Sequence, residues 1–294
     1  MVSVSPGGEA WLGRFDSCLE AATTITRATE GLYLGDDALF DYGARLAMGQ
    51  ALVRAAFLAA PVEQIVVWDG EASAGSVGTG RDVDTWRASG RRTHVISVNG
   101  PPNGATTSAE EPTRTQEHVL HSMLFGDIKG FSTLTEAQIP TFFRSVMGPL
   151  AATLDRFGSA VLYRNSWGDG LYVVLEDVAT AADCTLALQE TMKAIDLAAL
   201  GLPEGLGLRV GAHVGPVFAG EDPVRKEPTF YGSEVTRTAR IEPRTPEGEV
   251  YVTNSFAALA ALEAEDEVSC QYVGHVACAK DYGILPMYVL KRRQ

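Results

Sequence analysis

The sequence predicts an α+β protein built around an antiparallel-rich sheet, and two observations support this. From about residue 120 onward, short apolar strands and helices follow one another in the order β-α-β-β-α-β, which places helices against a face of the sheet. The pair Asp169-Gly170 lies between two apolar stretches, which is a strong signal for a β-hairpin. With 294 residues, 46% of them hydrophobic, the chain has enough apolar material for such a core.

The charge and hydropathy of the chain exclude several classes of function. The net charge of −13 disfavours a general nucleic-acid surface, which would be basic. It also requires that an anionic substrate be held by local cations or by metal. No apolar run approaches the roughly 18 residues that a membrane span needs. We therefore expect a cytoplasmic protein without a nucleic-acid or membrane partner.

A segment rich in Pro, Gly, Ser, Thr and Glu divides the chain at 101–112. We place an N-terminal accessory region at 1–115 and a catalytic domain at 116–294. Upstream of the boundary, apolar spacing predicts a helix over 39–60. A strand, a Gly-rich loop, a helix and a second strand then follow over 64–98, which is one βαβ unit and too little for a full sheet.

The elements of the C-terminal part follow from apolar spacing and turn residues. Long helices are expected at 136–157 and 178–197, a helix from about Val235, and a shorter helix at 255–264. Strands are expected at 123–128, at both sides of the hairpin within 160–177, at 208–220 and at 248–253, with two more at the end of the chain.

Two carboxylates have the arrangement that a metal site needs. Asp127 ends the first strand of this part, and Asp169 sits at the tip of the hairpin. Because the first strand and the hairpin lie side by side in a β-α-β-β sheet, the two side chains can meet at one edge. Paired acidic oxygens on rigid strands suit Mg²⁺ or Mn²⁺, with the backbone of Ile128 as a further ligand. Taken singly, each aspartate could be only a turn residue.

The turn that follows Asp127 suits a phosphate group. The sequence passes from Lys129 through Gly130, Phe131, Ser132 and Thr133 toward a helix. Free N–H groups at such a turn form an anion-binding nest.

Four segments resemble class III adenylate and guanylate cyclases. FGDIKGFSTLT and NSWGDGLYVVL resemble the two metal motifs, GLRVGAHVGPVFAG resembles the strand and dimer-arm segment, and YGSEVTRTARIEP is similar to the segment with the transition-state pair. They occur in the family's order, and the resemblance covers about 117–292. It implies a ferredoxin-like catalytic domain that closes a nucleoside triphosphate into a 3′,5′-cyclic monophosphate with two divalent metal ions, Mn²⁺ or Mg²⁺.

The resemblance also implies roles for single residues. Asp127 and Asp169 match the metal-binding aspartates, Arg240 the arginine that stabilises charge on the reacting phosphate, and Lys280 a lysine that binds the triphosphate. In the family the metals sit on one chain and these cations on the other, so a head-to-tail homodimer with two shared sites is implied. Taken alone, Arg240 could equally form a surface ion pair with Glu234 or Glu242.

Three positions depart from the pattern of purine cyclases. Asn165 stands where a lysine is expected, Thr229 where an aspartate is expected, and Thr236 where the transition-state asparagine is expected. The lysine and aspartate read adenine in adenylate cyclases. Asn165 and the neighbouring Arg164 can instead donate to the carbonyls of uracil.

Three interpretations remain open. The pattern resembles the pyrimidine cyclases of bacterial anti-phage signalling, the Pycsar type, which make cyclic UMP or cyclic CMP. Asn165 and Thr229 could also hydrogen-bond adenine, which would make an adenylate cyclase. A non-catalytic nucleotide-binding domain is the third interpretation, although Asp127, Asp169, Arg240 and Lys280 are all retained. We expect a separate effector protein to respond to the product, because no effector domain is visible in this chain.

Overall fold

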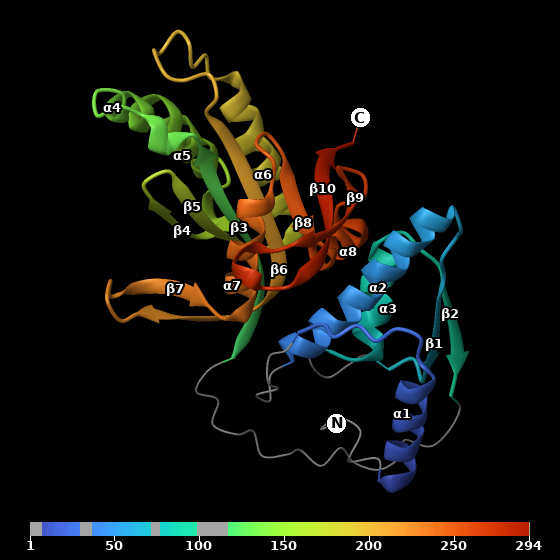
Figure 1. The fold of residues 1–294 in the computed structure, drawn as a ribbon. Coiled ribbons are helices and arrows are strands. Elements are labelled where there is room, and N and C mark those ends of the chain that lie inside the picture. Colours follow the sequence, from blue (N-terminus) through green and yellow to red (C-terminus); the bar gives the residue numbers. More distant parts are fainter. Residues whose placement is uncertain (1–7, 30–36, 72–76, 99–116, 294) are drawn as a thin grey trace. The chain divides into compact units, whose positions relative to one another are not determined.

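The computed structural model describes residues 8–29, 37–71, 77–98 and 117–293 (Figure 1). The chain forms two compact units, residues 1–30 and residues 31–294. The first unit contains the helix α1 (Glu9–Ala21), of which no residue is buried. The predicted linker at 101–112 lies outside the described residues. None of the described helices is long and apolar enough to cross a membrane.

The second unit is organised around a large sheet in the order β4-β5-β3-β6-β8-β10-β9, with β7 paired to β6. All strand pairs of this large sheet are antiparallel except that of β6 with β8, so the predicted antiparallel-rich sheet is confirmed. The strands are β3 (His118–Lys129), β4 (Val161–Trp167), β5 (Gly170–Leu175), β6 (Gly207–Asp222), β7 (Glu227–Tyr231), β8 (Val250–Thr253), β9 (Val268–Ala277) and β10 (Ile284–Arg292).

The helices of this part also follow the prediction, with one interruption. They are α4 (Ile139–Phe142), α5 (Gly148–Asp155), α6 (Val178–Ala194), α7 (Ser233–Ile241) and α8 (Asn254–Glu263). The single helix expected at 136–157 is divided by a π-helical turn, Phe143–Met147, between α4 and α5. Such turns add a residue to the hydrogen-bonded ring of the helix and often occur near functional sites.

The two faces of the sheet are covered differently. Successive side chains of β6 point to opposite faces of the sheet. The even-numbered residues Leu208, Val210 and Ala212 are buried on the face opposite α7. Helices α6 and α8 also contact this strand. The odd-numbered residues face α7, because Gly211 and Gly215 lie directly under it. The expectation that all helices cover one face is therefore wrong for α7, which lies on the face that carries Asp127.

The predicted βαβ unit is confirmed. Strands β1 (Gln64–Trp68) and β2 (Thr93–Ser97) pair in parallel, with α3 (Thr79–Ala88) between them in the chain. They form a separate two-stranded sheet rather than an extension of the large one.

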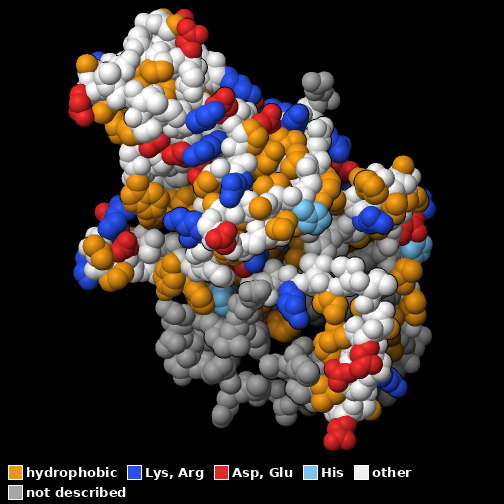
Figure 2. All heavy atoms as spheres, viewed as in Figure 1, with side chains coloured by type: hydrophobic (Ala, Val, Ile, Leu, Met, Phe, Trp, Pro, Cys, Tyr) orange, Lys and Arg blue, Asp and Glu red, His pale blue; other side chains and the backbone are white. Residues whose placement is uncertain are grey.

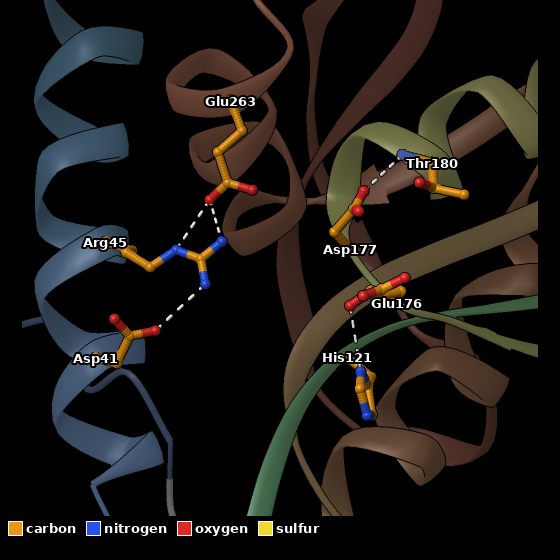
Figure 3. A network of polar contacts seen from close by, with 7 residues as sticks. All are labelled: Asp41, Arg45, His121, Glu176, Asp177, Thr180 and Glu263. Atoms are coloured by element: carbon orange, nitrogen blue, oxygen red, sulfur yellow. Dashed lines mark hydrogen bonds and ion pairs between the residues drawn. The ribbon is translucent and has the colours of Figure 1, made fainter. Parts of the chain in front are cut away.

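Helix α2 (Ala38–Leu58) joins the N-terminal part to the large sheet by packing along α8. Its buried residues Tyr42, Leu46, Gly49 and Leu52 recur at the spacing of one helix face. Gly49 is required here, because a Cβ at this position would lie 2.1 Å from the carbonyl oxygen of Ala258. At the rim of the contact, Arg45 pairs with Glu263 of α8 and, within α2, with Asp41 (Figure 3).

Candidate active site

Asp127 and Asp169 lie side by side at the end of two neighbouring strands. Strand β3 pairs with β5 up to Gly126 opposite Leu171, so Asp127 reaches the tip of the β4–β5 hairpin where Asp169 lies. Burial, the Asp127 carboxylate and a hydrogen bond between the two carboxyl groups raise the pKa of Asp169 to about 6, while the N–H of Ile128 donates to Asp169. The fold thus holds two carboxyl groups close together although their negative charges repel each other.

Arg209 and Glu242 extend the aspartate pair into a larger cluster of ionisable side chains. Arg209 is the cross-strand partner of Asp127 on β6, and its guanidinium lies 2.6 Å from the Asp127 carboxylate. It also pairs with Glu242, which directly follows α7. Burial raises the pKa of Glu242 to about 7 against the effect of Arg209, and Asp127 adds to the increase. Sequence reasoning missed Arg209, although its position opposite Asp127 in the strand register could have identified it.

The donor set fits a divalent metal ion that arrives with a nucleotide. In the described part of the chain, no cluster of three His, Cys, Asp or Glu side chains could hold a metal ion unaided. Mg²⁺ commonly uses one or two protein carboxylates and completes its shell with water and substrate phosphates. Asp127 and Asp169 supply those carboxylates. Ile128 is buried, and because its side chain is aliphatic, it can contribute only its backbone carbonyl.

The turn after Asp127 offers fewer amides than the sequence suggests. Gly130 has a φ of +90°, which favours glycine, and a short 3₁₀ helix covers Phe131–Thr133. The Thr133 N–H and hydroxyl both donate to the Gly130 carbonyl, at 3.0 and 2.7 Å. The Thr133 N–H is thus committed to the turn, whereas the described backbone hydrogen bonds do not engage the N–H groups of Gly130, Phe131 and Ser132.

Helix α7 presents Thr236 and Arg240. Thr236 is exposed and Arg240 is half-buried. Among the described residues, no ion pair involves Arg240, because the alternative partners named from the sequence are used elsewhere. Glu242 pairs with Arg209, and Glu234 pairs with His213 and Arg237.

Lys280 occupies an unusual backbone conformation. It lies in the connection between β9 and β10 with a φ of +55°, and Asp281 follows with a φ of +52°. Residues with a side chain adopt this left-handed region at a cost and often do so at functional sites. The Lys280 side chain is exposed to solvent.

The structure separates Arg164 from Asn165. Successive side chains on β4 point to opposite faces of the sheet. Asn165 shares the face of Tyr163, whereas Arg164 points to the other face and pairs with Asp155 at the end of α5. The two neighbouring residues therefore do not share one face of the sheet, and a role for Arg164 beside the substrate base stays a prediction.

Four aromatic side chains form a cluster on the Asn165 side of the sheet. Phe125 stacks on Tyr172 at 4.6 Å between ring centroids, and Tyr163 lies 5.3 Å from Tyr172. Phe230 of β7 contacts Tyr163, and the Tyr172 hydroxyl donates to the Phe230 carbonyl at 3.2 Å. Thr229, next to Phe230, points to the opposite face of β7. Sequence reasoning missed this cluster because its members come from four separate strands.

The predicted site residues thus form separate groups within one chain. Asp127 and Asp169 are joined, and α7, which carries Arg240, packs against β3, although among the described residues no ion pair or hydrogen bond links the aspartates to Arg240 or Lys280. On the face shown in Figure 2, Lys and Arg side chains lie among Asp and Glu side chains without forming one large basic patch.

Comparison with known proteins agrees with this geometry. The family described as "Adenylate and Guanylate cyclase catalytic domain" matches residues 113–291. The adenylyl cyclase CyaB from P. aeruginosa has a TM-score of 0.54 at 18% identity, covering 61% of this chain and 97% of that one. The catalytic core of a rhodopsin-guanylyl cyclase with converted specificity, in complex with ATPαS, has a TM-score of 0.50 at 20% identity, covering 60% and 98%. No curated protein matches this chain.

Because these structures are only 18% and 20% identical to this chain, they support the fold alone. The family match covers more than half of the chain. Cyclases of this class use divalent metal ions, generally two, in keeping with the paired aspartates on β3 and at the β4–β5 tip. The chain belongs to the adenylate and guanylate cyclase catalytic-domain family.

Proposed function

We propose that this protein is a nucleotidyl cyclase that converts a nucleoside triphosphate, preferentially UTP or CTP, to its 3′,5′-cyclic monophosphate and pyrophosphate. The observation that supports this reaction is the Asp127–Asp169 pair, in which the end of β3 meets the tip of the β4–β5 hairpin. Family membership supports cyclase activity. The base preference rests on the neutral side chains of Asn165 and Thr229.

The proposed reaction is an in-line displacement. The ribose 3′-hydroxyl gives up its proton to water as its oxygen bonds to the α-phosphorus. The bond from that phosphorus to the α–β bridging oxygen breaks, and pyrophosphate leaves with its electron pair. When bound, divalent metal supplies Lewis acidity to the 3′-hydroxyl and to the phosphate oxygens. Asp127 and Asp169 would hold the metal ions beside the 3′-hydroxyl and the α-phosphate.

The remaining residues meet the negative charge of the phosphates. Arg240 donates a planar pair of N–H groups to the α-phosphate, and Thr236 adds a hydroxyl donor. Lys280, as a compact cation, holds the leaving pyrophosphate together with the amides of Phe131 and Ser132.

We propose a homodimer in which each site uses both subunits. Family membership supports this, because in cyclases of this kind the metal-binding aspartates and the phosphate-binding cations come from different chains. Symmetric head-to-tail pairing would bring α7 and the β9–β10 connection of one subunit to the aspartates of the other. Two equivalent sites result.

The base preference follows from the chemistry beside Asn165. An amide side chain both donates and accepts, which suits the alternating carbonyl and N–H groups of a pyrimidine. The aromatic cluster of Phe125, Tyr163, Tyr172 and Phe230 fills the same face with bulky rings, which favours the smaller base. Adenine is the second candidate, because Asn165 and Thr229 can also satisfy its N1 and N6 groups.

The first experiment is a substrate assay. Purified protein with Mn²⁺ receives ATP, GTP, CTP and UTP separately, and each cyclic product is quantified. Mostly cyclic UMP or CMP is expected. Mostly cyclic AMP would overturn the base preference and keep the cyclase. Triphosphate binding without release of pyrophosphate from any of the four would favour a non-catalytic regulatory domain.

Two variants test the metal-binding role. Asp169→Ala is expected to abolish product while the protein remains folded. Asp183→Ala is the matched control, since Asp183 of α6 is a partly exposed carboxylate in an ion pair with Arg292. Full activity in Asp169→Ala would contradict the two-metal assignment.

A second pair of variants tests which residue reads the base. Asn165→Ala is expected to reduce the preference between UTP and ATP. Arg164→Ala is expected to leave it unchanged, because Arg164 points to the other face. The reverse result would return Arg164 to the base site.

A role in bacterial anti-phage signalling extends this proposal. It rests on the resemblance to pyrimidine cyclases at Asn165, and it requires a separate effector protein that binds the cyclic nucleotide. Loss of phage resistance in cells carrying Asp169→Ala, with wild-type resistance in cells carrying Asp183→Ala, is the expected outcome. Equal resistance in both strains would contradict the role.

A further inference from the structure

A tyrosine from the N-terminal part of the chain is fully buried in the catalytic part. Tyr42 of α2 is 0% exposed, and its hydroxyl donates to the Val214 carbonyl of β6 at 3.2 Å. Burial raises the pKa of Tyr42 to about 12, and the Ser255 hydroxyl of α8 hydrogen-bonds the same oxygen. Both hydrogen-bonding capacities of the phenol are therefore used, as expected for a buried polar group.

The two residues that Tyr42 holds lie beside a buried polar network. Val214 directly follows His213, whose Nε2 lies 2.8 Å from the Glu234 carboxylate and whose Nδ1 lies 2.8 Å from the Thr253 hydroxyl. Ser255 lies two residues after Thr253, which caps the N-terminus of α8. Tyr42 thus joins the two elements, β6 and α8, that hold His213 in place.

The network continues into α7 and toward Lys280. Glu234 is 1% exposed and pairs with Arg237 at 2.8 Å, so a carboxylate and a guanidinium are fixed against each other under α7. Burial lowers the pKa of the Arg237 guanidinium, but the Glu234 carboxylate and a hydrogen bond with Tyr282 raise it, and the net pKa is raised. Tyr282 lies two residues after Lys280, directly beyond the two left-handed residues.

Arg237 lies between Thr236 and Arg240 along α7. The side chains that meet the α-phosphate and the loop that carries Lys280 are therefore connected through one buried set of polar groups. The paired groups of such a set stiffen the elements that they join, and losing one partner is costly. Within this set, the Arg237 Nε has no hydrogen-bond partner among the described residues.

We propose that Tyr42 and the Glu234–Arg237 pair are positioning residues of the cyclase, through which α2 holds α7 and the Lys280 loop in their catalytic arrangement. This inference rests on the proposed function, because it assigns Arg240, Thr236 and Lys280 to the phosphates. It gives the N-terminal part of the chain a role in turnover. Displacements of about 1 Å in catalytic groups can lower a rate on the order of a hundredfold, so a small shift of α7 is sufficient.

The test uses the full chain with Tyr42→Phe, which removes one hydroxyl and keeps the ring. We expect kcat to fall roughly tenfold with KM for the triphosphate nearly unchanged, because the affected groups act on the transition state. Thr153→Val is the matched control, since it removes a buried hydroxyl that pairs with Thr191 between α5 and α6, away from α7. It is expected to keep the wild-type kcat.

Arg237→Gln tests the other end of the network. Because it also frees the Lys280 loop, it should raise KM as well as lower kcat. The double variant with Tyr42→Phe should have the kcat of Arg237→Gln alone if both act through one network. Effects that simply multiply would overturn the connection between them.

Hydrogen exchange separates this inference from the proposed function. Tyr42→Phe should speed exchange of the backbone amides in α7 and at 279–283, whereas Thr153→Val should not. If the wild type is inactive with all four triphosphates, the proposed function fails, while faster exchange in α7 still supports the structural connection. An active Tyr42→Phe with unchanged kcat and unchanged exchange would overturn the inference.

Discussion

Asp169 has acid–base chemistry that differs clearly from its ordinary behaviour in water. Burial and the neighbouring Asp127 carboxylate raise its pKa from 3.8 to about 6. A raised carboxyl pKa means that the folded state prefers the protonated form. The stability that this proton contributes is fully present below the ordinary pKa and is lost as the pH rises through about 6.

Asp169→Asn should therefore change the pH dependence of stability. Without metal, the variant should have a Tm close to that of the wild type near pH 4 and a higher Tm above pH 6, because it avoids the buried charge. With Mn²⁺ the order should reverse above pH 6, since only the wild type can bind the ion. Thermal unfolding followed by circular dichroism across this range measures both effects.

A Mn²⁺-induced rise in Tm that is the same at pH 5 and pH 8 would contradict this prediction. Asp183→Asn provides the control, because Asp183 is paired with Arg292 on the surface. It should follow the wild type at every pH.

Thr236 is the second residue whose type matters for the rate. It occupies the place of the transition-state asparagine in the family pattern, and it is exposed on α7. Thr236→Asn should raise kcat, by about tenfold or more, because a longer amide donor reaches the reacting phosphate; one such donor is worth roughly 10²–10³ in rate. Steady-state kinetics with the preferred triphosphate gives the answer, and a kcat at or below the wild-type value would count against the role.

At the scale of elements, the sheet could be predicted because its signals are local. The Asp-Gly turn and the alternating apolar residues fix the β4–β5 hairpin, and the hairpin fixes where Asp169 lies. Alternation along a strand could have placed Arg164 and Asn165 on opposite faces from the sequence alone, and burial in β4 follows this alternation. The ion pair of Arg164 could not be predicted. Its partner Asp155 comes from α5, and tertiary contacts of this kind leave no pattern along the sequence.

The interruption of one helix and the placement of another could not be predicted from the sequence either. The apolar positions of 136–157 suit a continuous helix, and nothing in their spacing marks the π-helical turn at Phe143–Met147. The position of α7 on the Asp127 face depends on Gly211 and Gly215, whose meaning appears only when β6 and α7 are seen together.

The close contact of α7 with β6 leads to a prediction about Gly211. A Cβ at this position would lie 2.7 Å from the backbone nitrogen of Glu242. Gly211→Ala should therefore push the end of α7 away, lower the free energy of unfolding by about 1–3 kcal/mol and reduce kcat. Gly205→Ala is the control, since no atom lies within 4 Å of its added Cβ. Urea unfolding of both variants measures the difference, and equal stability would contradict the prediction.

At the scale of the whole molecule, the central expectation is a site shared by two chains. Asp169→Ala lacks the metal site and Arg240→Ala lacks the phosphate cation, so each homodimer should be inactive. Mixing them in equal amounts should restore about a quarter of the wild-type activity, because half of the dimers are mixed and each of those has one intact site. No recovery after subunit exchange would contradict the shared site.

The packing of α2 along α8 has a consequence for how such a protein can evolve. The family match begins at residue 113, yet the compact unit that contains it extends from 31 to 294. The stretch shared with relatives is thus shorter than the stretch that folds together. A gene fusion that carried only the shared stretch to a new chain would expose the α8 surface around Ala258 and leave the Val214 carbonyl without the Tyr42 hydroxyl. Recombination should therefore tend to move this cyclase together with its own α2 helix.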